Sequence, residues 1–495
     1  MSTTADASSN PQSEATQNRG RLLQVLGVWF GIAAAIGNTI AAGIVRTPGD
    51  VAARLPNPWM FLGVWTLGGA YALIGASSMA ELGALIPRSG GQYNFARRGI
   101  GEYAGFLVGW SDWLSTCGTN AAVAIVIGEY SLGFVDHLNG HLPLLFNLVT
   151  SLDANSRALT IKIIAVSVLL LFGILQWRGV KWGSSAQLLT AAMKTGAFII
   201  VVGACFLLGG NLRQAAAGAA VAPPAIHLGW PLITAFLLAL QAVVYTVDGW
   251  DGVIYFGAEV KNPGRDVPRA IFGSVFSIMA IYLLLNAAVL YVLPMSEVAG
   301  NNFALGAAAN RVFGHLGDPV IRLIMIVSLL SCINACQMFA ARTLFAMSSD
   351  RLFFKQAARV NKGGTPATAL FLSTVVGIIF ILGSFERVIA MLSFFFVANY
   401  ALSYASLFRL RTNEPEANRP YRAWGYPWTS ALALIASVVF LLSSLGLDLK
   451  NAIQQHERWP PPPPMLAFVI LLVSYPLFRV MKWAATAAEK RAKSK

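Results

Sequence analysis

The chain has 495 residues, of which 56% are hydrophobic and only 12% are charged, and its mean hydropathy is +0.61. Soluble domains carry about 25% charged residues, so this composition excludes an ordinary soluble enzyme or binding domain. The formal net charge of +14 lies mainly in short polar stretches between apolar runs. This distribution indicates membrane topology and gives no reason to expect a nucleic-acid partner.

Hydropathy predicts an all-α integral membrane protein with twelve transmembrane helices. In chain order the predicted helices cover residues 23–54, 59–86, 103–134, 158–177, 182–209, 230–260, 268–294, 318–348, 366–384, 386–409, 426–447 and 465–482. An even number of helices places both termini on one side of the bilayer. The loops on that side carry most of the Lys and Arg residues, which makes it the cytoplasmic side. We therefore expect a multi-pass protein of the cell inner (plasma) membrane.

The terminal segments have compositions unlike the apolar core. Residues 1–20 are rich in Ser, Thr, Asn and Gln, so we expect a disordered cytoplasmic tail without a cleavable signal peptide. Residues 483–495 form a basic cytoplasmic tail. Pro460–Pro464 precede the last predicted helix and are typical of a stiff spacer.

Cysteine and histidine residues suggest neither a disulfide framework nor a metal site. All four cysteines fall within predicted helices, where small packing residues are expected: Cys117, Cys205, Cys332 and Cys336. The five histidines all fall in predicted outward loops. Among them, the spacing of His137 and His141 could hold a metal on a helix, but a solvated loop is the preferred interpretation. We expect no metal and no cofactor.

Two predicted spans, the first and the sixth, are interrupted by small residues. The first interruption is Gly37–Gly43, and the second is Asp248–Gly252. An unpaired backbone group inside hydrocarbon costs several kcal/mol, so a helix is broken there only where the freed groups meet protein, water or ligand. Matched interruptions in the two halves of a membrane protein indicate the substrate site of a transporter.

Four separate stretches carry motifs of one family of membrane proteins. They are Ile40–Gly49, Ala80–Tyr93, Asp248–Ala270 and Arg419–Pro427. These motifs resemble those of the amino acid–polyamine–organocation superfamily of permeases, and within it the L-type amino acid transporters and their bacterial relatives. The resemblance extends from about residue 22 to about residue 430.

The resemblance implies a particular fold, which composition alone does not indicate. It consists of two inverted five-helix repeats, with helices 1 and 6 discontinuous and helices 11 and 12 outside the repeats. The transport core then covers residues 21–410, with repeats at about 21–210 and 228–410. Helices 11 and 12 occupy residues 411–482.

The first break offers backbone groups to a ligand. If the helix ends near Ile40 and restarts near Ile44, the free amides of Ala42, Gly43 and Ile44 form an anion site for a substrate carboxylate. Carbonyl groups beside Ile40 and Ala41, where the first half ends, suit the α-amino group. The family's usual Gly-Ser-Gly is Ala41-Ala42-Gly43 here, which removes a hydroxyl group. The alternative is a small-residue stretch for close helix packing.

The second break carries two carboxylates near the middle of the membrane. Asp248 and Asp251 could bind a substrate amine, a cationic side chain or a proton. Capping of the restarted half-helix is the favoured role of Asp248, whereas substrate contact and proton handling stay open for Asp251. Relatives often have Asn at the second position, so Asp251 departs from the family pattern. We expect Gly249 to contact substrate as well.

The resemblance implies a role for each of Tyr245 and Lys194. Tyr245 matches the family's aromatic gate, which closes over the ligand and excludes water; a packing aromatic is the alternative. Lys194 matches the lysine on helix 5 that reaches between helices 1 and 8, where sodium-driven relatives of the fold hold a sodium ion. This match predicts sodium-independent transport or proton coupling. The alternative is a lysine that snorkels to the membrane surface.

Polar residues elsewhere in the predicted helices complete the candidate site. The expected neighbours of Lys194 on helix 8 are Ser328, Ser331 and Asn334. Thr119, Asn120 and Asn399 are weaker candidates for the substrate pocket, since interhelical hydrogen bonds explain them equally well. Asp112 is expected to have a structural partner. A solvated or loop-pinning role suffices for Glu81 and Glu259.

The sequence therefore predicts a sodium-independent amino acid transporter that works by alternating access, as an exchanger or a proton-linked carrier. The alternatives are a carrier of cationic amino acids or polyamines and an amino acid sensor that does not transport. A channel or an enzyme has little support, because neither a selectivity-filter repeat nor a catalytic constellation is evident. The expected partners are a small amino acid or amine and the lipid bilayer. No heavy-chain subunit is expected, since no cysteine lies outside a predicted helix.

Overall fold

A computed structural model describes residues 22–55, 57–139, 153–209, 229–383, 385–454 and 463–493. The predicted N-terminal tail and the first three residues of the proline spacer lie outside these ranges, as do His141, His227 and His456. The side chain of His137 is not described either. His315 lies in a short 3-10 turn, η3 (Gly314–Leu316).

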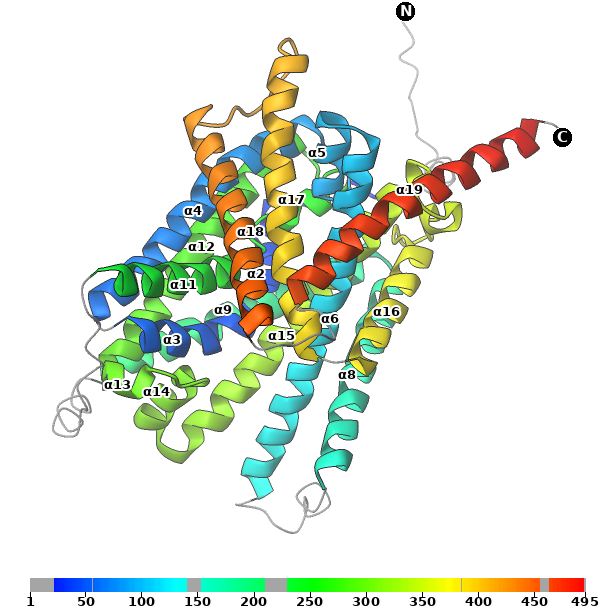
Figure 1. Ribbon diagram of the computed structural model, residues 1–495. Helices are drawn as coiled ribbons and strands as arrows, with labels where there is room; N and C mark the ends of the chain where they lie inside the picture. The colour runs from blue at the N-terminus through cyan, green and yellow to red at the C-terminus, as the bar shows by residue number, and fades with distance from the viewer. Residues whose placement is uncertain are drawn as a thin grey trace, which may run out of the picture.

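Each of the predicted spans contains an α-helix (Figure 1). The helices are α2 (Val28–Thr39) with α3 (Gly43–Arg54), α4 (Pro58–Leu85), α6 (Glu102–Asn139), α8 (Ala154–Trp177), α9 (Val180–Leu208), α11 (Trp230–Val247), α12 (Pro263–Val292), α15 (Gly317–Ser349), α16 (Ala367–Leu382), α17 (Phe385–Asn413), α18 (Trp428–Gln454) and α19 (Pro463–Lys493). By length and apolar composition, seven helices among the described residues qualify as membrane spans, or eight if the bent pair α2 and α3 counts as one. The chain is thus a multi-span helical membrane protein. The twelve-span topology and the inverted repeats stay predictions.

Three shorter helices lie in segments that the sequence assigned to loops. They are α5 (Gln92–Gly99), α13 (Met295–Val298) and α14 (Ala304–Phe313). In Figure 1, α13 and α14 lie at the end of the bundle near α3, whereas α5 lies at the opposite end. Hydropathy could not reveal them, because each is far shorter than the roughly 20 residues that cross a bilayer.

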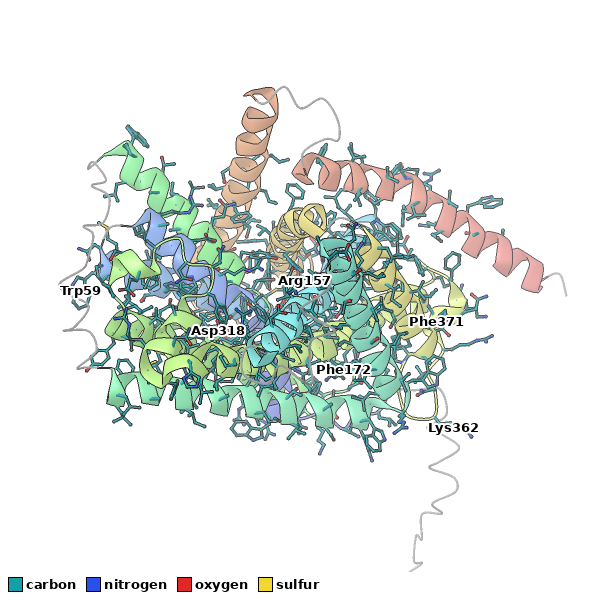
Figure 2. The ribbon with its side chains drawn as sticks, turned by 90° about the horizontal axis from the view of Figure 1, so that it is seen from below. Trp59, Arg157, Phe172, Asp318, Lys362 and Phe371 are labelled. Carbon is teal, nitrogen blue, oxygen red and sulfur yellow. The ribbon has the colours of Figure 1, made fainter. Side chains whose placement is uncertain are left out.

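The outer surface of the bundle is apolar. Trp59 on α4 is 80% exposed and Phe371 on α16 is 58% exposed, and both lie at the periphery of the bundle in Figure 2. Exposed apolar side chains also cover α8, α9 and α18. Because lipid tails are as apolar as these side chains, such a surface fits a bilayer and not water.

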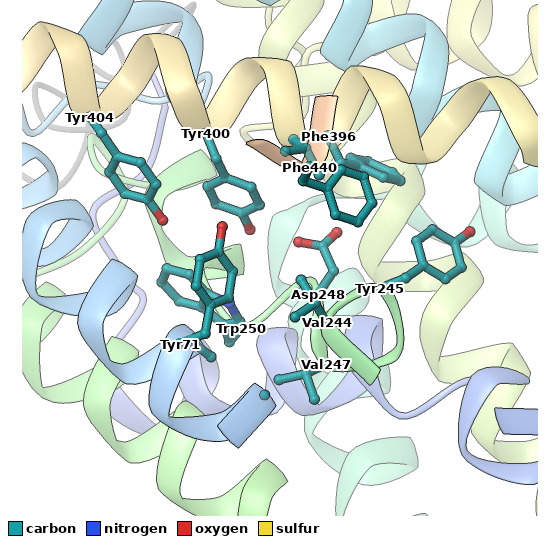
Figure 3. Close-up of a pocket in the computed structure, with 13 residues that line it drawn as sticks. Tyr71, Val244, Tyr245, Val247, Asp248, Trp250, Phe396, Tyr400, Tyr404 and Phe440 are labelled. Carbon is teal, nitrogen blue, oxygen red and sulfur yellow. The ribbon is translucent and has the colours of Figure 1, made fainter. Parts of the chain in front are cut away.

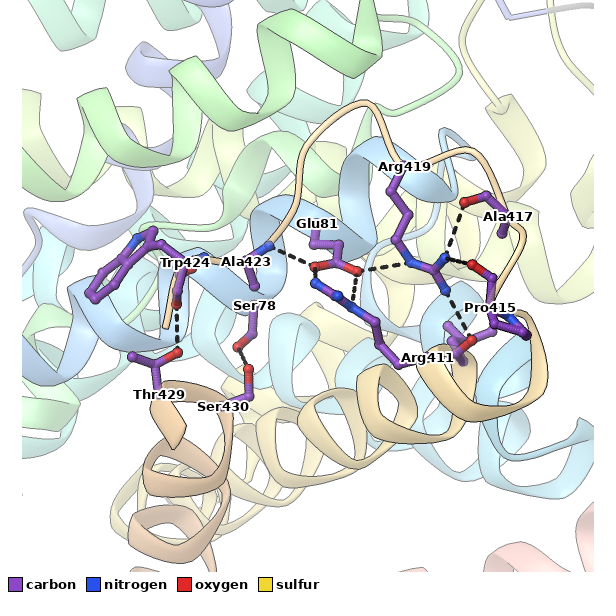
Figure 4. Close-up of polar contacts among 12 residues, drawn as sticks. Ser78, Glu81, Arg411, Pro415, Ala417, Arg419, Ala423, Trp424, Thr429 and Ser430 are labelled. Atoms are coloured by element: carbon purple, nitrogen blue, oxygen red, sulfur yellow. Dashed lines mark hydrogen bonds and ion pairs between the residues drawn. The ribbon is translucent and has the colours of Figure 1, made fainter. Parts of the chain in front are cut away.

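A buried carboxylate joins three segments at the predicted cytoplasmic end (Figure 4). Glu81 near the end of α4 is fully buried, and its oxygens accept from Arg411 at 2.8 and 2.6 Å. Arg419 forms an ion pair with it at 3.1 Å, and the backbone amide of Ala423 donates to it at 2.7 Å. Glu81 therefore pins the segment before α18, and the solvated role considered for it is wrong.

A second buried ion pair lies beside the segment that follows α11. Glu259 is fully buried and accepts from Arg342 of α15 at 2.6 and 2.7 Å. Ser89 donates to the same carboxylate at 3.4 Å, and the guanidinium lies over the ring of Phe256. The pair joins α15 to the segment that follows α11, and Ser89 connects the loop before α5 to the same carboxylate. Like Glu81, Glu259 has a pinning role and no contact with solvent.

Replacing Glu81 with Ala should destabilise the protein strongly. The change leaves two arginines without their buried partner, and loss of one member of such a pair costs about 3 kcal/mol or more. Thermal unfolding of the purified protein in detergent measures the effect. Glu416 is exposed in the same connecting segment and provides the control, since Glu416→Ala should leave the unfolding midpoint unchanged. Equal midpoints for the Glu81 variant and the wild type would contradict this assignment.

Candidate functional site

The first helix is broken at the predicted position. α2 ends at Thr39, α3 begins at Gly43, and the two segments meet at a bend of 52°. In the described structure, the backbone amides of Ala42, Gly43 and Ile44 have no backbone acceptor. These three donors point out of the first turn of α3, where the helix dipole favours a negative charge. The break can therefore receive a carboxylate.

The carbonyl groups freed by the break are occupied by side chains. The fully buried Lys194 of α9 donates from Nζ to the carbonyl oxygens of Gly37 at 3.0 Å and Ile40 at 2.9 Å. Ser328 of α15 donates to the Ile40 carbonyl at 2.6 Å. The amine of Lys194 thus lies between α9, α15 and the end of α2, and the snorkelling alternative for Lys194 is wrong.

The other two expected neighbours of Lys194 bond to Gln187 instead. Ser331 accepts from Gln187 Nε2 at 3.1 Å, and Asn334 donates to Gln187 Oε1 at 2.8 Å. Gln187 lies two turns before Lys194 on α9, so the residues later on the antiparallel α15 meet it and not the lysine. Gln187 also approaches α2 closely, since a Cβ atom at Gly37 would lie 1.7 Å from its Nε2 atom.

Tyr282 of α12 contacts both broken helices and was missed in the sequence. Its hydroxyl lies 2.8 Å from the carbonyl oxygen of Thr39 and 3.2 Å from that of Thr246, and it donates to both. The side chain is fully buried. A tyrosine among the apolar residues of the seventh predicted span was the available signal, because a buried hydroxyl needs a partner.

The second break has a different form from the first. α11 ends at Val247, and the chain resumes as a 3-10 turn, η2 (Gly252–Tyr255), so the predicted helix to residue 260 is wrong. Two glycines within five residues disfavour a helix restart. Gly249 has a φ of +103°, and a Cβ atom there would lie 2.3 Å from Asn38 Nδ2. This position therefore requires glycine.

Neither aspartate of the second break caps a helix. Asp248 terminates α11, so the capping role favoured for it is wrong. Asp251 precedes η2 but makes no capping bond; its carboxylate accepts from Gln92 Nε2 at 3.0 Å. Gln92 in turn accepts from Ser403 of α17 at 3.2 Å. Both carboxylates are therefore available for substrate contact or proton handling.

The two breaks face one cavity of about 420 Å³. Its walls also include parts of α6, α15 and α17. The candidate residues that line it are Ala41, Ala42, Gly43, Thr119, Tyr245, Asp248, Gly249 and Asp251. Ile40, Ile44, Asn120 and Asn399 do not line it. A cavity of this size lies within the roughly 300–1,000 Å³ that small-molecule sites occupy.

Asp248 also lines a second, smaller chamber, which lies next to the cavity. The chamber measures about 20 Å³, enough for one water molecule. Figure 3 shows the Asp248 carboxylate between the rings of Tyr245 and Tyr400, with Tyr71 and Tyr404 nearby. Among the described residues that line this chamber there is no Lys, Arg or His. The acid thus faces aromatic and aliphatic side chains and tyrosine hydroxyl groups.

Two of the remaining buried polar candidates, Asn399 and Asp112, have partners on other elements. Asn399 accepts from Ser111 at 2.8 Å, which joins α17 to α6. Asp112 accepts from Tyr255 at 2.8 Å and from Thr343 at 3.0 Å. The carboxylate of Asp112 therefore holds the floor of the cavity, where Tyr255 lies, to α15.

Comparison with known proteins decides the family. A family model described as amino acid permease matches residues 26–473. The chain belongs to the amino acid permease family. The permease is 29% identical to the serine/threonine exchanger SteT of Bacillus subtilis, over 88% of this chain and 93% of the relative.

Two mammalian relatives agree with this assignment. The permease is 25% identical to the mouse b(0,+)-type amino acid transporter 1, over 88% of this chain and 84% of the relative. It is 24% identical to the mouse Asc-type amino acid transporter 1, over 90% and 78% of the two chains. These relatives are transporters of amino acids, which supports transport and not enzymatic catalysis as the activity of the permease.

Replacing Tyr245 with Ala should raise the half-saturation concentration for uptake about tenfold, equivalent to about 1.4 kcal/mol. Tyr245 is 39% exposed and lines the cavity, so its ring is free to cover a ligand. Uptake into proteoliposomes measures the change. Tyr245→Phe is the matched control, because it keeps the ring and should retain the wild-type value. An unchanged half-saturation in the Ala variant would remove Tyr245 from the gate.

Proposed function

We propose that the permease is a secondary amino acid transporter that works by alternating access without sodium. The substrate lies in the cavity between the two breaks, with its carboxylate at the amides of Ala42, Gly43 and Ile44. This proposal is carried by one observation: three amides at the start of α3 have no backbone acceptor in the described part of the chain, and two of them belong to Ala42 and Gly43, which line the cavity. A zwitterion can satisfy these donors with its carboxylate and reach the carboxylates of α11 and η2 with its amino group.

Sodium independence is supported by the position of Lys194. The carbonyl oxygens of Gly37 and Ile40 and the hydroxyl of Ser328 are oxygen ligands of the kind that hold a hard cation. Lys194 Nζ donates to both carbonyls, so a protonatable amine that belongs to the protein occupies this place. A transported sodium ion is then unnecessary for closing the broken helix.

Exchange is the mode of transport that the relatives favour. One of them is named as an exchanger of serine and threonine, and small neutral amino acids fit a cavity with apolar and hydroxyl groups on its walls. We further propose that the permease lies in the plasma membrane with both termini in the cytoplasm and acts without a heavy-chain subunit.

A carrier of cationic amino acids or polyamines is the second candidate, and the charges around the cavity favour it. Asp50, Asp248 and Asp251 line the cavity, whereas Arg46 is the only Lys or Arg among the described residues that line it. Arg46 already lies 3.7 Å from Glu129. A substrate with an additional positive charge would balance these carboxylates better than a neutral zwitterion does.

Initial rates of amino acid uptake into proteoliposomes should be equal in sodium chloride and in choline chloride. Lys194→Ala should lower the rate at least about tenfold, because the buried carbonyl group of Gly37 loses its side-chain donor and that of Ile40 keeps only Ser328, a loss worth about 1–3 kcal/mol. The exposed Lys181 on the same helix supplies the control, and Lys181→Ala should retain the rate. A rate that requires sodium would refute the proposal, as would a Lys194 variant with wild-type rates at every pH.

Competition by unlabelled solutes should separate the two candidate substrates. If the permease carries neutral amino acids, serine and threonine reduce the uptake of labelled threonine, whereas lysine and putrescine do not. If it carries cations, the basic solutes alone compete for labelled lysine, and Asp251→Asn lowers lysine uptake about tenfold by removing one carboxylate. Absence of uptake of both labelled threonine and labelled lysine would leave the sensor as the remaining interpretation.

A further inference from the structure

Two cysteines face the cavity from α15, and transport as proposed does not use them. Cys332 and Cys336 are four residues apart, so their side chains lie one helical turn apart on the same face. Their sulfur atoms are 4.0 Å from each other. Both residues are among those that line the cavity, although each is nearly buried.

The two thiols contact the first break through one residue. Cys336 Sγ donates to Asn38 Oδ1 at 2.9 Å, and Cys332 Sγ lies 3.4 Å from the Asn38 carbonyl oxygen. Asn38 also touches the second break, since a Cβ atom at Gly249 would lie 2.3 Å from its Nδ2 atom. A ligand that binds both sulfurs therefore removes both donors from Asn38 and projects into the space between the breaks.

We infer that Cys332 and Cys336 form a dithiol site for thiophilic metal or metalloid ions, and that its occupation blocks transport. Soft thiolate ligands select soft ions, and two sulfurs suit ions that need only two protein ligands. In the described part of the chain, no group of three or more His, Cys, Asp or Glu residues is placed to hold a metal. A tetrahedral zinc site is therefore not the class of site proposed.

Trivalent arsenic supplies a balanced reaction for this site. Phenylarsine oxide forms two As–S bonds with two thiols, while its arsenic–oxygen bond breaks. The two thiol protons leave with that oxygen as water, and arsenic stays trivalent, so no oxidant or reductant is needed. A sulfur separation of 4.0 Å allows one arsenic atom to bridge the pair after small side-chain rotations.

The other two cysteines provide internal controls. Cys117 lies on α6 in an apolar cluster with Trp113 and Ala340, and Cys205 lies on α9. Both are buried, and neither lines the cavity. A reagent that bridges two thiols should therefore leave both of them unmodified.

Intact-mass spectrometry of the purified protein treated with phenylarsine oxide tests the site directly. The wild type should gain one phenylarsenic group, which survives a monothiol wash and is removed by 2,3-dimercaptopropanol. Cys332→Ser and Cys336→Ser should each lose the wash-resistant adduct, whereas Cys117→Ser and Cys205→Ser should keep it. An adduct that persists in the Cys332→Ser/Cys336→Ser double variant would overturn the inference.

The effect on uptake rests on the proposed function, whereas the adduct does not. In proteoliposomes, phenylarsine oxide should abolish wild-type uptake. Each single variant should need at least about a tenfold higher concentration of phenylarsine oxide for the same inhibition, because the arsenic atom then binds one sulfur instead of bridging two. A wash-resistant adduct with undiminished uptake would refute the blocking role. If no amino acid is transported at all, the adduct still decides whether the dithiol site exists.

Discussion

The structure depends on one constraint: backbone groups freed inside a membrane must find partners within the protein. Breaking the first helix after Thr39 frees carbonyls on one side and amides on the other. Lys194, Ser328 and Tyr282 satisfy the carbonyls of Gly37, Ile40 and Thr39. Among the described residues, the amides of Ala42, Gly43 and Ile44 at the start of α3 have no backbone acceptor. The protein thus completes one half of the break itself and leaves the other half to a ligand.

Three buried carboxylates that do not line the cavity hold the fold together. Glu81, Glu259 and Asp112 are all buried, and each joins segments that are distant in the chain. A buried carboxylate is costly without donors, so each fixes its surroundings only while all its partners are present. The partners of Glu81 and Glu259 are arginines, whereas Asp248 and Asp251, which line the cavity, have no Lys or Arg among their hydrogen-bond partners in the described part of the chain. This contrast separates residues that hold the fold from residues available to substrate.

The long helices could be predicted from the sequence, because a helix that spans a membrane needs about 20 consecutive apolar residues. Apolar runs gave the long helices, and the small residues of Gly37–Gly43 gave the first break at its observed place. The helix restart after Gly252 was wrong, because the chain after η2 pairs its backbone with Leu26 and Ser89, which are distant in sequence. Contacts such as Gln187 with Asn334 depend on how two helices face each other, which hydropathy does not encode. The resemblance placed Lys194; periodicity alone could only mark it as unusual.

The hydroxyl of Tyr282 has a mechanical consequence. One proton is shared between the carbonyl oxygens of Thr39 and Thr246, at 2.8 and 3.2 Å, so neither acceptor holds it alone. Such a bifurcated bond tolerates small sliding of one acceptor relative to the other, because shortening one arm offsets lengthening of the other. It ties the end of α2 to the end of α11 while permitting limited shear between them. A larger displacement would break one arm of the bond, which leaves that buried carbonyl group without its tyrosine donor.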